Sequence, residues 1–191
     1  MDGFDPIRRS ANDLHDATLH AGGDPLDPLA FVMRAIDALE SLALDLVWLD
    51  PDDPGLKGAR ARFDDQAGLI CCENIGVPSS RALLVAHELG HAKLHAGSLN
   101  CTSTDVDASQ TTEAAAVGLQ RVETYGARER QELQANVFAR EFIFPRSLAR
   151  RLFIDDNMSA AAIVERTGLP IAVVRQQLFD ALLLPPETKT E

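Results

Sequence analysis

Interpretation of the chain starts from one short run, Val85-Ala86-His87-Glu88-Leu89-Gly90-His91. The two histidines are four residues apart, so on an α-helix they lie one turn apart on the same face. Two imidazoles at that spacing can hold one metal ion, and zinc accepts imidazole nitrogen readily. Glu88 stands beside the first histidine. In hydrolytic zinc sites a glutamate at that position takes the proton from the attacking water and delivers it to the leaving group.

The residues around this run predict a buried helix from about Ser80 to about His95, with Ser79 as its N-cap and an end at Gly97. An ordinary helix with surface histidines is the alternative, because the motif also arises by chance. A helix that is apolar almost all round is buried, however, and buried histidines and glutamates need partners. The apolar positions are Leu83, Leu84, Val85, Ala86, Leu89, Ala92 and Leu94.

A second helix, predicted from Arg128 to about Phe144, supplies the remaining ligand. Catalytic zinc keeps three protein ligands and one open position, and Glu132 can provide the third. Asn136 follows one turn later and can accept a hydrogen bond from the outer nitrogen of a ligand histidine, which fixes the ring. Three other glutamates are alternatives to Glu132, but none is followed by an asparagine four residues later. They are Glu113, Glu123 and Glu129.

Two further residues near these helices have weaker claims to a role. His95 continues the face of His87 and His91, and the favoured interpretation is a helix-end histidine that interacts with the last carbonyls. Tyr125 is the only tyrosine and could donate to a developing oxyanion. A loop tyrosine without that role is the favoured interpretation.

The run from Val85 to His91, followed by Leu94-His95, resembles the active-site helix of the ImmA/IrrE family of metallopeptidases. The later run Glu132-Leu133-Gln134-Ala135-Asn136-Val137-Phe138-Ala139, ending at Ile143-Phe144-Pro145, resembles that family's second signature. The resemblance covers about residues 28 to 183 in order and character. It implies an α+β fold with a zincin-like core, in which two helices and a small β-sheet surround the metal.

The resemblance also implies a division of roles among these residues. His87, His91 and Glu132 would hold Zn²⁺, with Mn²⁺ as the alternative metal, Glu88 would be the general base, and Asn136 would orient a ligand. The implied activity is cleavage of a protein partner, usually a helix-turn-helix transcriptional repressor.

The remaining sequence predicts the domain organisation. An N-terminal arm at 1–27, with a short helix near Ile7 to Leu19, precedes a metallopeptidase domain at 28–146. That domain should begin with a helix from Pro28 to Leu46, capped by Asp27, and contain strands near Arg60 to Phe63 and Gly68 to Cys72. Either strand could offer a sheet edge to an extended substrate. Residues 98–124 predict a long surface loop.

The C-terminal part, 147–184, has a helix-turn-helix pattern and precedes a short tail at 185–191 that is predicted to be disordered. A recognition helix for DNA should expose basic and amide groups. Only Arg175, Gln176 and Gln177 qualify, and Glu165 and Asp180 oppose them. A packing module or a protein-docking surface is therefore favoured over direct DNA contact.

Composition narrows the function classes. The formal net charge of -11 disfavours non-specific binding to nucleic acid, whose phosphates are also negative. Cys71, Cys72 and Cys101 make a poor disulfide framework, and buried free thiols are the better interpretation. No apolar window is long enough for a membrane span and the N-terminus lacks a secretory signal, so the expected compartment is the cytoplasm.

Two functional hypotheses remain open at this point. The first is a zinc endopeptidase that cuts a partner protein, such as a repressor, in a flexible linker. The alternative is a regulatory, protein-binding subunit of a DNA-processing or defence assembly with little peptidase activity. Glu88 favours the first hypothesis, because a structural zinc site has no use for a base beside its ligands.

Overall fold

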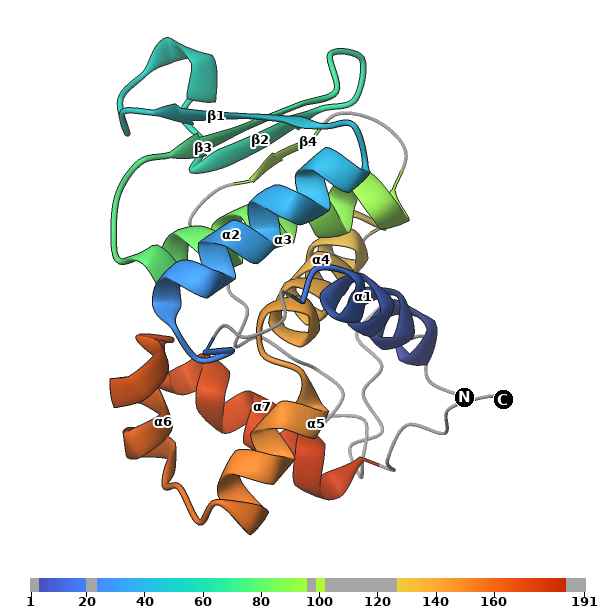
Figure 1. Ribbon diagram of the computed structural model, residues 1–191. Coiled ribbons are helices and arrows are strands. Elements are labelled where there is room, and N and C mark those ends of the chain that lie inside the picture. The colour runs from blue at the N-terminus through green and yellow to red at the C-terminus, as the bar shows by residue number, and fades with distance from the viewer. Residues whose placement is uncertain (1–3, 20–23, 96–98, 102–126, 185–191) are drawn as a thin grey trace.

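The computed structural model describes residues 4–19, 24–95, 99–101 and 127–184, and is mostly helical with one small sheet (Figure 1). This mixed α and β composition confirms the predicted α+β class. The elements are α1 (Asp5–Ala17), α2 (Pro28–Ser41), β1 (Asp45–Leu49), η1 (Pro54–Leu56), β2 (Ala61–Asp64), β3 (Leu69–Glu73), α3 (Pro78–Leu94), β4 (Leu99–Cys101), α4 (Ala127–Ile143), α5 (Arg146–Arg150), the π-helical turn η3 (Arg151–Asp155), α6 (Ala160–Thr167) and α7 (Ile171–Leu183).

The sheet has the strand order β1-β3-β2-β4. β1 runs parallel to β3, whereas β2 runs antiparallel to both β3 and β4. The two strands predicted from sequence, β2 and β3, are present but both lie inside the sheet. The expectation that either of them offers a free edge is therefore wrong, since β1 and β4 flank them.

Those two flanking strands were not predicted. The helix expected to reach Leu46 ends at Ser41, and Ala43 takes a left-handed conformation with φ 54° that no helix can continue through. Beyond it, Asp45 to Leu49 pair with Leu69 to Glu73. The apolar residues at 42, 43 and 46 happen to keep a helical spacing, which conceals the strand. β4 falls at the start of the segment that was expected to be a long surface loop.

The helices form a layer on the sheet and then continue away from it. α2 and α3 pack side by side against the strands, and α4 packs on α3 (Figure 1). Asp27 caps α2 as predicted, because its carboxylate accepts from the amide of Leu29 at 2.9 Å. The core that results is continuous from the sheet to α4 and includes Phe31, Leu39, Ile70, Leu84, Leu89, Phe138 and Phe142.

The N-terminal helix α1 is part of this packing and not a detached arm. It lies against α4, where Ile7, Ala11 and Leu14 are buried. His15 is also buried, and its Nδ1 donates a hydrogen bond to the carbonyl oxygen of Phe142 at 2.7 Å. Burial, assisted by the charge of Arg34, lowers the pKa of His15 from 6.5 to about 4.

The start of α3 differs from the prediction in one respect. The helix begins at Pro78, its N-cap position is Val77, and no side chain caps it. Ser79, the predicted cap, is fully buried and its hydroxyl donates to the carbonyl oxygen of Gly168 at 2.6 Å. This serine therefore ties α3 to the turn between α6 and α7 instead of capping its own helix.

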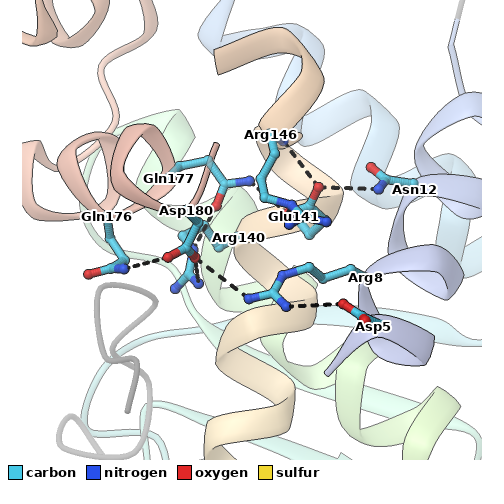
Figure 2. A network of polar contacts seen from close by, with 9 residues as sticks. All are labelled: Asp5, Arg8, Asn12, Arg140, Glu141, Arg146, Gln176, Gln177 and Asp180. Atoms are coloured by element: carbon cyan, nitrogen blue, oxygen red, sulfur yellow. Dashed lines mark hydrogen bonds and ion pairs between the residues drawn. The ribbon is translucent and has the colours of Figure 1, made fainter. Parts of the chain in front are cut away.

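The C-terminal helices are joined to α4 by a buried polar network (Figure 2). Arg140 of α4 donates through Nη2 to Asp180 Oδ2 at 2.7 Å and through Nε to the side-chain oxygen Oε1 of Gln177 at 2.7 Å. The Gln177 amide in turn donates to Glu141 at 2.8 Å. Gln177 is thus fully buried and cannot contact DNA as a recognition residue would. The network crosses the predicted domain boundary at 146.

No helix among the described residues is both long enough and apolar enough to cross a membrane. The predicted disordered tail at 185–191 lies outside the described residues, as does nearly all of the predicted 98–124 loop.

Candidate metal centre

The centre forms where α3 and α4 approach closely. Gly90 of α3 makes that approach possible, because a Cβ placed there would lie 3.0 Å from the Cα of Ala135 and 3.2 Å from its carbonyl oxygen. Both of these atoms belong to the backbone of α4 and cannot rotate away. The contact places the His87 and His91 face of α3 against the Glu132 and Asn136 face of α4.

Three donor atoms converge at this contact. His87 Nε2 and His91 Nε2 lie 3.0 Å apart, and each is 3.2 Å from Glu132 Oε2. All three side chains are buried. Two histidines and a carboxylate therefore form a compact triangle of ligand atoms inside the protein, drawn from the two helices that the sequence singled out.

The dimensions of this triangle fit a small divalent cation. Zinc binds imidazole nitrogen and carboxylate oxygen at about 2.0–2.1 Å, so two ligand atoms at tetrahedral corners are about 3.3 Å apart. The three measured separations fall within a few tenths of an ångström of that value. A cation at the centre would take the place of the hydrogen bonds that join these three side chains to one another. The residues present thus fit a metal ion with three protein ligands.

The outer nitrogen of each histidine also has a partner. His87 Nδ1 lies 2.9 Å from Asn136 Oδ1, so Asn136 accepts its proton and leaves Nε2 directed toward the triangle. Asn136 is fully buried. This is the contact for which Asn136 was singled out from the sequence, and it fixes the ring of His87 in the orientation that a metal ligand needs.

His91 has a longer chain of partners. Its Nδ1 lies 2.9 Å from His95 Nδ1, and His95 Nε2 lies 3.0 Å from Gln134 Oε1. The interpretation of His95 as a histidine that interacts with helix-end carbonyls is therefore wrong, because its ring contacts two side chains instead. Burial is the main cause that lowers the pKa of His95. The hydrogen bond to Gln134 acts in the opposite direction, because it favours the charged ring.

The charge at the triangle belongs to Glu132. Burial alone would raise its pKa, but contacts with His87 and His91, and their charge, outweigh that effect and lower the pKa to about 2. The guanidinium of Arg128 lies 3.8 Å from the other carboxylate oxygen. Glu132 is therefore an anion at neutral pH, in the form that binds a cation.

Glu88 lies fully buried on the same helix turn as His87. It also comes close to β3, where the buried thiol of Cys72 has a strongly raised pKa. The main cause is burial, followed by the negative charge of Glu88. Cys71 and Cys72 are both free and buried, which confirms their predicted state. The carboxylate of Glu88 is therefore buried close enough to β3 for its charge to act on Cys72.

Of the three alternative glutamates, the described residues include only Glu129. Glu129 is exposed at the start of α4, while Glu113, Glu123 and Tyr125 lie outside the described residues. Sequence reasoning missed Gln134 altogether. The signal that could have found it is its place on α4 between Glu132 and Asn136, combined with the third histidine of the series His87, His91 and His95.

No family model, no curated protein and no solved structure matches the chain. The interpretation of the centre therefore depends on the ligand geometry and on the chemistry of its residues.

Proposed function

We propose that the chain is a zinc-dependent endopeptidase with a zincin-like core, in which His87, His91 and Glu132 hold the metal and Glu88 is the general base. The observation that carries the proposal is the buried triangle of ligand atoms with separations of 3.0–3.2 Å. A structural zinc site normally has four protein ligands. Three ligands leave one position for water and substrate, and a buried glutamate beside them supplies the proton transfer that hydrolysis needs.

The ligand set supports zinc as the metal. Two neutral imidazoles and one carboxylate are typical of catalytic zinc, whereas manganese prefers a shell richer in oxygen. When bound, a zinc ion acts as a Lewis acid that polarises a carbonyl and makes water a stronger nucleophile at neutral pH. Manganese in the purified protein would change the metal but leave the ligand assignment intact.

The protein side chains perform the remaining work. Glu88 accepts the proton of the attacking water and passes it to the nitrogen of the leaving amine, so one carboxylate acts first as base and then as acid. Burial of Glu88 excludes bulk water, so the proton goes to the leaving group and not to solvent. Asn136 keeps the ring of His87 oriented throughout.

For the substrate we propose a flexible linker in a partner protein, with a helix-turn-helix repressor as the leading candidate. The sequence resemblance to ImmA/IrrE peptidases supports this choice. A folded domain cannot thread an extended segment into a buried centre, so the cleaved bond should lie between domains. The net charge of -11 supports a basic docking surface on the partner.

The first test combines metal content with cleavage. Purified protein should contain about one zinc ion per chain, and His87→Ala should abolish occupancy. Glu88→Gln should keep the metal and the thermal stability while turnover falls by at least about a hundredfold, because the base is lost and the ligands are not. Glu129→Gln, at an exposed site on α4, is the matched control and should cleave normally.

Substrates would be sought by co-expression with the products of neighbouring genes, with mass spectrometry of every fragment. A cut inside a stable helix or strand would contradict the linker proposal. Wild-type turnover by Glu88→Gln would contradict the role of Glu88. Full zinc occupancy with no cleavage of any partner, in wild type and variant alike, would favour the regulatory alternative.

A further inference from the structure

We propose that His95 and Gln134 act together as a positioning pair that holds His91 in its metal-binding orientation. The inference rests on the proposed metal site, and neither residue would touch the metal itself. It concerns a part of the centre that the ligand motif does not include, namely the outer side of the second histidine.

The pair joins the two helices of the centre beyond the ligands. His95 follows the last residue of α3, and its backbone is extended, with φ -129° and ψ 144°. Its amide still donates to the carbonyl oxygen of His91 at 2.9 Å, which holds the residue against the helix end. From there its ring bridges His91, at 2.9 Å, and Gln134 of α4, at 3.0 Å.

The chemistry of these atoms fixes the direction of both hydrogen bonds. The Oε1 atom of Gln134 can only accept, so His95 Nε2 carries the proton of a neutral ring. His95 Nδ1 is then a lone pair, and His91 Nδ1 must be the donor across the 2.9 Å contact. The remaining nitrogen of His91, Nε2, is left with its lone pair directed at the metal triangle. One amide oxygen thus selects the tautomer of a ligand two rings away.

Side-chain amides of α4 orient both proposed ligand histidines. Asn136 accepts directly from His87 at 2.9 Å, whereas Gln134 acts on His91 through His95. α4 therefore provides the third ligand, Glu132, and two amides that orient the first and second. Partners of this kind raise metal affinity because a ring that is already oriented loses less entropy on binding, and their removal typically costs ten- to a hundredfold in affinity.

Four variants separate the hydrogen bond from simple packing. His95→Phe keeps a planar ring but cannot accept, and Gln134→Leu keeps the side-chain shape but removes the acceptor oxygen. His95→Asn places an amide oxygen near the position of Nδ1 and should restore acceptance from His91. Lys93→Ala is the matched control, since Lys93 is exposed on the same helix end.

The measurements are the zinc affinity by competition with a chelator, the visible spectrum of the cobalt-loaded protein, and the ring N–H protons of the zinc-loaded protein by NMR. His95→Phe should weaken zinc binding about tenfold to a hundredfold. It should also alter the cobalt spectrum and move the His91 Nδ1 proton upfield with faster exchange. Gln134→Leu should act in the same direction, His95→Asn should recover most of the affinity, and Lys93→Ala should match wild type.

Wild-type affinity and spectra in both His95→Phe and Gln134→Leu would overturn the proposal. So would a loss in His95→Asn as large as that in His95→Phe, because the effect would then come from packing and not from the accepted hydrogen bond. A wild-type protein that binds neither zinc nor cobalt would instead overturn the metal site on which the inference rests. Because no substrate is needed, the result does not depend on peptidase activity.

Discussion

At the scale of single residues, the proposed ligand set depends on Glu132, which is the one proposed ligand that does not come from α3. It is also the only anion in the triangle, and its low pKa keeps it ionised at neutral pH. Without it, two neutral imidazoles would have to hold a divalent cation alone, which is weaker both in charge and in coordination number.

We therefore expect Glu132→Ala to bind zinc at least about a hundredfold more weakly than wild type. In a competition with a chelator, the variant should lose its zinc under conditions in which wild type keeps it. Glu129→Ala removes the same charge one turn earlier on α4, at an exposed position, and should bind zinc as wild type does. Equal losses in the two variants would mean that overall negative charge, and not ligation by Glu132, holds the metal.

His15 predicts a dependence of stability on pH. Its pKa is about 4 in the folded protein and 6.5 when exposed, because burial opposes its charge. Above pH 6.5 the ring is neutral in both states and has no effect. As the pH falls from 6.5 to 4, only the unfolded state takes up the proton, so the free energy of unfolding falls, by about 3 kcal/mol over the whole interval.

The test is urea unfolding of metal-free wild type and His15→Gln at pH 8 and pH 5. Glutamine can still donate toward the carbonyl oxygen of Phe142 but does not titrate in this range. The variant should lose about 2 kcal/mol less than wild type between the two pH values. Other groups titrate equally in both proteins, so parallel losses would show that His15 is not the sensitive group.

At the scale of elements, the close packing of α3 on α4 determines whether the ligands meet. Alanine is intrinsically better than glycine in a helix by about 1 kcal/mol. At position 90, however, its methyl would press on the backbone of Ala135 at 3.0 and 3.2 Å, and overpacking typically costs about 1–3 kcal/mol. The second effect is larger because a backbone cannot rotate out of the way.

Gly90→Ala should therefore lower the melting temperature and weaken zinc binding together, since moving the helices apart separates Glu132 from the histidines. Lys93→Ala on the exposed side of α3 should leave both quantities near wild type. Differential scanning fluorimetry with and without zinc measures the two effects. A Gly90→Ala protein that is more stable and binds zinc normally would show that the helices have room to adjust.

The sequence was a good guide to helices and a poor guide to the outer strands. α3 and α4 were predictable because a long apolar or amphipathic pattern and a recognisable end are local properties of the chain. β1 was not, because its side chains alternate only weakly in burial and its pairing with β3 is a contact distant in sequence. β4 has three residues, too few for any periodicity.

The candidate site shows the same division. His87, His91, Glu132 and Asn136 were identifiable because spacing along a helix determines which side chains share a face. The roles of His95 and Gln134 were not, since their contact requires the end of one helix to meet the middle of another. The prediction that Ser79 is an N-cap was wrong for a related reason. Its hydroxyl donates to the carbonyl oxygen of Gly168, which is distant in sequence, and local sequence rules cannot identify such a partner.

At the scale of the whole molecule, the buried network of Figure 2 joins α1, α4 and α7. Arg140 and Asp180 are 1% and 4% exposed and lie 2.7 Å apart. Arg166 and Asp24 lie at the same distance but are 57% and 43% exposed. The two ion pairs therefore have the same N–O distance, but one is buried and the other is exposed, so each is a control for the other.

Asp180→Asn should lower the free energy of unfolding by about 3 kcal/mol, because it leaves buried arginine charge uncompensated. Asp24→Asn should cost less than about 1 kcal/mol, since water already screens that pair. Urea unfolding of both variants beside wild type measures the difference. Similar losses in the two would show that the buried network contributes no more than a surface ion pair.

The network also has a consequence for the order in which the protein matures during synthesis. Arg8 and Asp180, which approach within 3.8 Å, are made far apart in time on the ribosome. Residues 87–136 are synthesised before Gln177 and Asp180. Until α7 is made, Arg140 and Glu141 of α4 therefore lack the α7 partners that they bond in the finished protein. Completion of this packing therefore depends on residues of α7, which are translated later than those of α4.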